Sequence, residues 1–272
     1  AALHAPQIAR HARQCPRQLW LTHHRPDLIP RDHPATWRRA NDGRIVGERA
    51  RAALGPGVWW PPGNPDPVAA AASALGELRA NPATTAVEFP AVSGPLYIRA
   101  DALIPVPGGY LLSETKAKTF PLKKDKVTPD EPEDHLIDDV AIQLWTLTNA
   151  GVPIARAELN LLDGRWRYPG NGDYRGLFRS QNVTGSAGAR MASVPAWADE
   201  AAAILAGPMP AVVTGFPLTS WSWMTGVWLN AVPLMAAAGG CVTIPSRPAP
   251  PATAVAVKVT GSPVMPAGAA SA

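Results

Sequence analysis

Three consecutive strand-like segments joined by short turns constrain the fold of this chain more than any other feature. They are Thr84–Val92, Leu96–Ile104 and Gly109–Ala117. A helix is expected to follow over Asp134–Ala150, and a further strand over Ala157–Asp163. This order predicts an α/β fold in which helices flank a central mixed β-sheet.

Two helices are expected before these strands. The first, Pro34–Leu54, ends at Gly55-Pro56, and the second, Val68–Arg79, ends at Asn81-Pro82. Glycine, asparagine and proline at such positions are typical of helix ends. With 272 residues the chain has room for one large domain, or for a domain with an appendage.

The C-terminal part differs in character from the rest. Residues 206–272 carry charge only at Arg247 and Lys258 and show no helical or alternating period. An asparagine, a proline and two glycines interrupt the apolar run Val227–Ile244, whereas a membrane span needs about 20 clean apolar residues. We therefore expect a domain over residues 1–205 and a Pro- and Ala-rich tail, either poorly ordered or altered by a reading-frame error.

The net charge and the number of cysteines indicate the kind of partner and the cellular compartment, but they do not indicate a function. The net charge of +4 fits a polyanionic partner but does not require one. Two cysteines, Cys15 and Cys241, are too few for a disulfide framework. Two histidines and two arginines between residues 4 and 13 stand where a secretory peptide has its apolar core. The sequence therefore predicts a cytoplasmic protein without an export signal.

Candidate catalytic residues lie on the hairpin of the second and third strands. Its turn is centred near Pro107–Gly108, and a symmetric closure there puts Asp101 directly opposite Glu114. Directly opposed Cβ atoms are about 5 Å apart. Residues two apart share one face of a strand, so Lys116 is expected beside Glu114.

Two opposed carboxylates repel each other unless a positive charge lies between them. A divalent cation such as Mg²⁺ or Mn²⁺ suits these hard oxygen ligands, and Lys116 adds a fixed positive charge. Metal, carboxylates and lysine together are suited to phosphodiester hydrolysis. The alternative is a solvated hairpin face on which Glu114 and Lys116 form an ordinary surface pair.

Further candidates surround this hairpin. Gln143 falls in the apolar stripe of the next helix, and it either satisfies a backbone group in the core or reaches the site. The loop after the hairpin is rich in lysine and either follows a phosphate backbone or is an ordinary solvated loop, because acidic residues follow closely. Its candidate nucleic-acid-binding residues are Lys118, Lys123 and Lys124.

A set of motifs between about Cys15 and Asn182 carries a family resemblance. They are Cys15–Trp20, Gly43–Glu48, Asp101 followed by Glu114-Thr115-Lys116, His135–Gln143 and the Leu159–Asp163 strand. With these motifs the chain resembles the RecB-like branch of the PD-(D/E)XK nuclease superfamily, which includes the CRISPR-associated RecB-like exonucleases.

The resemblance implies a restriction-endonuclease-like core with its site at the edge of the sheet. It implies DNA cleavage with one or two metal ions, in which Asp101, Glu114 and Thr115 lie at the metal and Lys116 and Gln143 support catalysis. DNA, and a helicase or another repair or defence protein, are the partners that it implies.

The chain departs from the family pattern in three places. Gly47 stands where many members have a metal-binding histidine, and the adjacent Glu48 is either a replacement ligand or a helix-surface charge. Leu147 replaces a family tyrosine. Relatives with a motif like that at Cys15 often hold an iron–sulfur cluster with three more cysteines. Here Cys241 is the only other cysteine, so either the cluster is absent or the tail has lost its ligands.

The sequence thus predicts a metal-dependent nuclease, either an exonuclease or an endonuclease. The alternative is a catalytically inactive nuclease-fold module that binds nucleic acid or serves as a scaffold within a longer protein.

Overall fold

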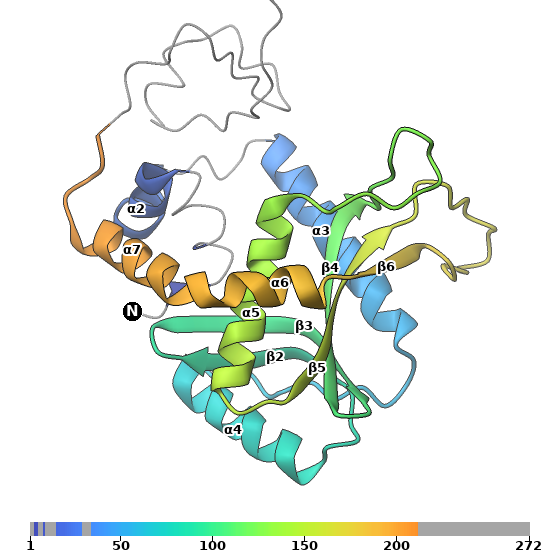
Figure 1. The fold of residues 1–272 in the computed structure, drawn as a ribbon, viewed down its shortest axis with the longest axis horizontal. Helices are drawn as coiled ribbons and strands as arrows, with labels where there is room; N and C mark the ends of the chain where they lie inside the picture. Colours follow the sequence, from blue (N-terminus) through green and yellow to red (C-terminus); the bar gives the residue numbers. More distant parts are fainter. Residues whose placement is uncertain (1–2, 5–7, 9–14, 29–33, 212–272) are drawn as a thin grey trace, which may run out of the picture.

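The computed structural model describes residues 3–4, 8, 15–28 and 34–211 (Figure 1). Its centre is a six-stranded sheet in the order β1-β3-β4-β5-β6, with β2 on the other edge of β3. Pairing is parallel for β1–β3 and β4–β5 and antiparallel elsewhere, which confirms the predicted mixed sheet. The strands are β1 Leu3–His4, β2 Ala86–Ser93, β3 Leu96–Val106, β4 Gly109–Thr119, β5 Ile154–Leu162 and β6 Phe178–Asn182.

Helices cover both faces of this sheet, so the predicted α/β fold is confirmed (Figure 1). On one face α5 packs on β2, β3 and β5, and on the other α3 packs on β4. The helices are α2 Pro16–His24, α3 Pro34–Ala53, α4 Pro67–Ala80, α5 Asp134–Asn149, α6 Thr184–Arg190 and α7 Val194–Ala206, with short 3₁₀ turns at Pro26–Leu28 and Met191–Ser193.

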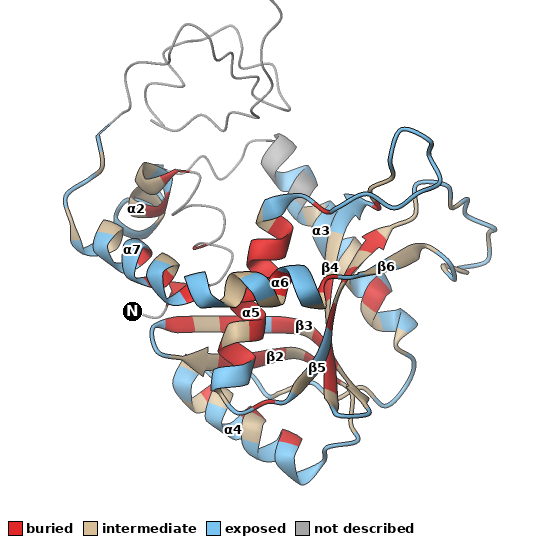
Figure 2. Ribbon diagram, viewed as in Figure 1, coloured by how far each residue is buried: buried red, intermediate tan, exposed pale blue. Residues whose placement is uncertain are grey.

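The core lies between α5 and the sheet. Eleven residues of α5 are buried, and Figure 2 shows this helix as an almost continuous buried column in front of the strands. Val140, Ile142 and Leu147 have no exposed surface and pack in one cluster with Leu112 and Leu159 of the sheet. Burial of this apolar area is the main force that holds α5 on the sheet.

Two strands, β1 and β4, pair with different parts of the same edge of β3. Leu96 pairs with both Leu3 and Ser93, so β1 and β2 lie on opposite edges of β3. β4 shares the edge of β1 but pairs with β3 only from Ala102 onward. The two strands of the hairpin therefore part just before Ala102, and Asp101 lies at the point of separation.

Most of the predicted elements agree with the structure to within three residues. β4 runs to Thr119, beyond the expected end at Ala117, and β2 begins at Ala86. The sequence reasoning missed α2, α6, α7, β1 and β6, which are short or carry weak periodicity.

The described chain continues past the expected domain boundary at residue 205. The helix α7 ends at Ala206, and the Trp20 indole then donates a hydrogen bond to the Gly207 carbonyl at 3.0 Å. Residues 212–272, which include most of the predicted tail 206–272 and its apolar run, lie outside the described residues. Among the helices that the structure does describe, none has the length and apolar character that crossing a membrane requires.

The hairpin turn depends on a glycine. Val106 pairs with Gly109 across the turn, so the predicted register is confirmed. Gly109 has φ +139°, and a Cβ atom at this position would lie 2.3 Å from the Pro153 carbonyl oxygen. The next residue, Tyr110, donates its backbone N–H to the same oxygen at 2.9 Å. The turn is thereby fastened to the segment that enters β5.

We expect Gly109→Ala to destabilise the protein by about 2 kcal/mol or more, because a strained φ adds to a backbone clash. The matched control is Gly76→Ala, in the middle of α4, where an added Cβ meets nothing within 4 Å. That substitution should stabilise the protein by roughly 0.5–1 kcal/mol. Urea unfolding of both variants tests this, and equal stability of the two would contradict the clash.

Candidate functional site

Asp101 occupies the fork between β3 and β4. Its Oδ2 accepts a hydrogen bond from the backbone N–H of Thr115 at 2.8 Å. Thr115 lies beyond Ser113, where the pairing of β4 with β3 ends. The β3–β4 register ends at the pair Ala102 and Ser113, one position before Asp101 and Glu114, and the charge of Asp101 acts on the Glu114 carboxyl. The carboxylate of Asp101 therefore takes the place of a strand partner.

Glu114 and Lys116 form a buried ion cluster with a residue of α5. The Lys116 Nζ lies 2.6 Å from Glu114 Oε1 and 2.5 Å from Asp139 Oδ2. The side chains of Glu114 and Asp139 are only 7% and 8% exposed, whereas that of Lys116 is 23% exposed. The Lys116 ammonium thus contacts two nearly inaccessible carboxylates. Glu114 and Lys116 are therefore not a solvated pair on the surface of the hairpin.

The electrostatics of the cluster are unbalanced. Burial, and next the charge of Asp101, raise the pKa of Glu114 to about 8 despite the nearby lysine. Burial also raises the pKa of Asp101, although the Thr115 N–H and Lys116 oppose it. For Lys116 burial lowers the pKa, but Glu114 and Asp139 outweigh burial and leave it above its ordinary value. The lysine is therefore charged, while the carboxylates lack enough positive charge around them.

Unpaired oxygens mark the same place. Glu114 Oε2, Asp139 Oδ1 and Gln143 Oε1 are buried and have no hydrogen-bond partner among the described residues. Gln143 lies one helical turn beyond Asp139 on α5, so their side chains project from the same side of the helix. A buried acceptor without a partner costs about 1–3 kcal/mol, which favours an additional ligand at this cluster.

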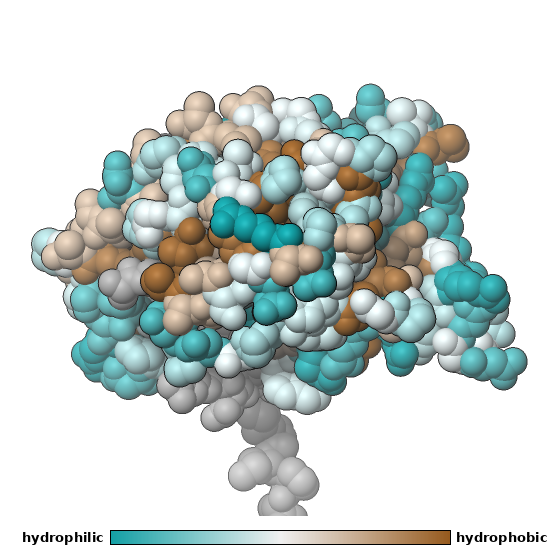
Figure 3. Space-filling view, turned by 90° about the horizontal axis from the view of Figure 1, so that it is seen from below, coloured by the Kyte–Doolittle hydropathy of each residue, from teal (hydrophilic) through white to brown (hydrophobic). Residues whose placement is uncertain are grey.

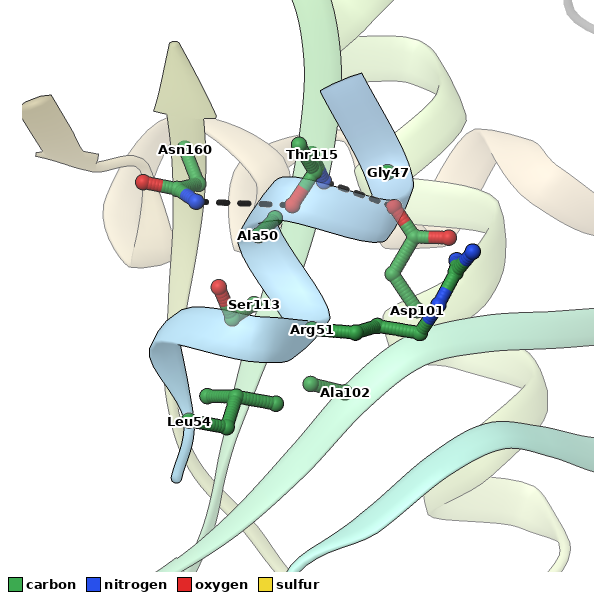
Figure 4. A pocket seen from close by; sticks show the side chains of 9 residues that line it. All are labelled: Gly47, Ala50, Arg51, Leu54, Asp101, Ala102, Ser113, Thr115 and Asn160. Carbon is green, nitrogen blue, oxygen red and sulfur yellow. Dashed lines mark hydrogen bonds between the residues drawn. The ribbon is translucent and has the colours of Figure 1, made fainter. Parts of the chain in front are cut away.

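A pocket opens on the opposite face of the hairpin, beneath α3 (Figure 4). Asp101 and Thr115 line it together with Ser113 and Asn160, and the Asn160 amide donates to Thr115 Oγ1 at 3.4 Å. From α3 come Gly47, Ala50, Arg51 and Leu54. Asp101 and Thr115 are the predicted ligands that line this pocket, and the charge of Asp101 also acts on Glu114, so Asp101 connects the two sides of the fork.

Glu88 completes a row of three acids across β2, β3 and β4. It lies across from Asp101 in the β2–β3 register, with a positive φ of 52°. Its Oε1 accepts from Arg51 at 2.9 Å and its Oε2 lies 3.1 Å from Arg99. Two arginines thus balance Glu88, whereas Lys116 is the positive charge that acts on both Asp101 and Glu114.

The donor atoms at the fork fit a hard divalent cation. Among the described residues no group of three or more His, Cys, Asp or Glu side chains is arranged to hold a metal ion. Mg²⁺, however, is commonly held by one or two carboxylates and keeps several of its waters. Asp101 and the unpartnered Oε2 of Glu114 supply such a pair.

No model of a known protein family matches this chain, and no curated protein matches it. One solved structure that resembles it is described as "Crystal structure of SSO0001". The two share 13% sequence identity, the similarity covers 75% of each chain, and the TM-score is 0.41. A similarity at this level carries no argument about function.

Of the other predicted ligands, Thr115 is at the site and Glu48 is not. Thr115 contributes its N–H to Asp101, and its role toward a metal stays a prediction. Glu48 lies outside the set of pocket-lining residues and pairs with Arg44 one turn earlier on α3. This position agrees with the helix-surface alternative.

The predicted nucleic-acid-binding lysines lie at the β4–α5 loop. Lys118 is half exposed and pairs with Glu133 at 2.7 Å, and Lys123 and Lys124 are exposed on the loop itself. Cys15 is buried at the start of α2, where its Sγ accepts the backbone N–H of Gln18 at 3.2 Å. Cys241, the other cysteine of the chain, lies outside the described residues, so the iron–sulfur role of Cys15 stays a prediction.

The sequence reasoning missed Asp139, which the structure puts at the centre of the site. The available signal was its spacing, because a residue four positions before Gln143 shares a helix face with it. Arg51 and Asn160 were also missed, since nothing in their local sequence connects them with the hairpin.

We expect the stability of the metal-free protein to depend on Glu114 through pH. A carboxyl with a folded pKa above its unfolded value stabilises the fold fully only below the unfolded value. That contribution is lost as pH rises through about 8. In EDTA, the unfolding free energy of the wild type should therefore fall relative to Glu114→Gln between pH 5 and 8, by on the order of 1 kcal/mol per pH unit.

Urea unfolding at several pH values measures this difference. Glu77→Gln is the matched control, because Glu77 is exposed on α4, and it should follow the wild type at each pH. Parallel profiles for wild type and Glu114→Gln would show that Glu114 has an ordinary pKa.

Proposed function

We propose that this protein is a metal-dependent nuclease that hydrolyses DNA phosphodiester bonds in the cytoplasm. The observation that carries the proposal is the buried carboxylate of Glu114, which contacts Lys116 at 2.6 Å and lies near enough to Asp101 to feel its charge. A hairpin with a purely structural role does not need two neighbouring acids, because an apolar pair would fill the same space at a lower cost in free energy. A catalytic role would account for the presence of both acids.

Asp101 and Glu114 are the residues that would hold Mg²⁺ or Mn²⁺. Such an ion, when bound, lowers the pKa of its water and offsets negative charge on a phosphate. The chain contributes two carboxylates whose positions are fixed, Asp101 by the Thr115 N–H and Glu114 by Lys116. Fixed ligands need no rearrangement during the reaction, which is the main advantage of a preorganised site.

Lys116 would hold an attacking water in place or stabilise charge on the phosphate. Its ammonium has three donors, and the two carboxylates use two of them. The third is available on the exposed part of the side chain. Asp139 is a positioning residue in this scheme, because it holds Lys116 from the helix side and keeps it charged.

DNA cleavage with end-labelled single- and double-stranded oligonucleotides tests the proposal. We expect cleavage with Mg²⁺ or Mn²⁺, none in EDTA, and a loss of about 100-fold or more in Glu114→Gln and Lys116→Gln. Glu77→Ala is the matched surface control. Circular dichroism of each variant establishes that it is folded, and the product ladder distinguishes exonuclease from endonuclease action.

Metal binding gives a second, independent test. An ion that binds only the folded protein stabilises it by about 3 kcal/mol at 100 times its Kd. For a domain of this size that is a rise in Tm of roughly 6–12 °C. We expect this rise in the wild type with Mn²⁺ and its loss in Asp101→Asn, measured by differential scanning calorimetry. An equal rise in Asp101→Asn would place the metal elsewhere.

The two tests together separate the proposed nuclease from its alternative. Metal-dependent stabilisation without cleavage of any DNA substrate would favour an inactive nuclease-fold module that binds nucleic acid or serves as a scaffold. A helicase or another repair or defence protein as a partner stays a prediction from the family resemblance, and copurification with the full chain is the direct test.

A further inference from the structure

The loop between β5 and β6, residues 163–177, carries three aromatic side chains packed on one another. The Tyr174 ring lies parallel to that of Trp166 at a centroid distance of 5.9 Å and stacks on that of Tyr168 at 5.2 Å. Trp166 and Tyr168 are 5.9 Å apart. We call these three residues the aromatic platform. Tyr168 is 52% exposed, so the platform is not part of the core.

Hydrogen bonds hold the loop in one shape. The Trp166 indole donates to the Arg175 carbonyl at 2.9 Å, across the base of the loop. The backbone N–H of Gly172 donates to the Tyr168 hydroxyl at 2.7 Å, which closes the tip. The tip itself turns through positive φ angles at Gly170, Asn171 and Gly172. The rings are thus preorganised, which reduces the entropy lost when a ligand binds.

Arginines surround the platform. The loop contains Arg165, Arg167 and Arg175, and Arg49 of α3 lies over the Tyr174 ring at 4.0 Å. Its acids are Asp163 and Asp173, and each pairs with an arginine two positions later. An excess of two arginines therefore remains beside the rings. Figure 3 shows hydrophilic residues gathered on the projection at the right of the molecule, where this loop and the β4–α5 loop lie.

The platform adjoins the candidate active site through α3. Arg49 contacts Tyr174, and the residues next to it on the helix, Ala50 and Arg51, line the pocket with Asp101. A ligand held on the rings therefore lies beside the helix that forms one wall of the pocket.

We propose that the aromatic platform binds unpaired bases of single-stranded DNA and delivers that strand to the fork at Asp101. The inference rests on the proposed nuclease function and names the form of its substrate. Exposed stacked rings bind bases of any sequence, because every base has a π face, and the adjacent arginines bind the phosphates. In duplex DNA the bases are stacked internally and offer no such face.

The experiment is fluorescence anisotropy of a labelled mixed-sequence single-stranded DNA, titrated in EDTA with the full chain. Tyr168→Ala should weaken binding about tenfold, since a base–aromatic stack is lost. Tyr168→Phe keeps the ring and should restore most of the binding, although it loses the contact to Gly172. Blunt duplex of the same sequence should bind more weakly than the single strand.

Arg167→Ala provides a second variant that leaves the rings in place. It should weaken single-strand binding and reduce the slope of log K against log salt by about 0.7, as expected for one phosphate contact. Arg25→Ala is the matched control, because Arg25 is a half-exposed arginine paired with Asp27 at the end of α2, away from the loop. The control should change neither affinity nor slope.

The outcomes separate this inference from the proposed function. Unchanged single-strand binding in both Tyr168→Ala and Arg167→Ala overturns the platform, even if metal-dependent cleavage is observed. Equal loss in Tyr168→Phe and Tyr168→Ala also overturns it, since the hydroxyl would then matter only for the shape of the loop. Platform-dependent binding without cleavage in Mg²⁺ or Mn²⁺ supports the platform and rejects the nuclease. A preference for RNA of the same sequence over DNA rejects the substrate named here.

Discussion

The ammonium of Lys116 is the interaction on which the site depends, because it is the positive charge shared by two buried carboxylates. Glu114 belongs to the sheet and Asp139 to α5, so the ion cluster also joins the two layers of the core. Removing one partner from such a cluster leaves an uncompensated buried charge, which costs far more than the pair contributes. Chemistry and packing are therefore coupled here, and the helix that forms the core also fixes the lysine.

The divided edge of β3 explains how Asp101 reaches the pocket under α3. Had β4 continued along β3, the Thr115 N–H would be part of the ladder and Asp101 would lie on a closed sheet. Because β4 departs and β1 takes over further along, the backbone opens at one point. Asp101 closes the gap with its own carboxylate, and so it lines the pocket under α3 while its charge acts on Glu114.

The sequence was sufficient for the mixed sheet, for the main helices and for the register of the β3–β4 turn, because alternation and a symmetric turn are local properties. It was not sufficient for Asp139, which reaches Lys116 only once α5 has docked on the sheet. Gln143 was open between two alternatives, and its burial agrees with a core position while its unpartnered Oε1 lies beside the ion cluster. Short elements such as β6 and α6 were not predicted, because they are too short to show a clear periodicity and their packing partners lie elsewhere in the sequence.

The contact between Gly109 and Pro153 has a consequence for how this site can be lost. A one-residue slip of a strand moves every side chain to the other face. If β4 slipped, Ser113 and Thr115 would point at α5, and Glu114 and Lys116 would point at α3. The glycine at the turn therefore sets the alignment of a site that it never touches. The site in this fold therefore depends on Gly109 as much as on its catalytic side chains, although Gly109 is not one of them.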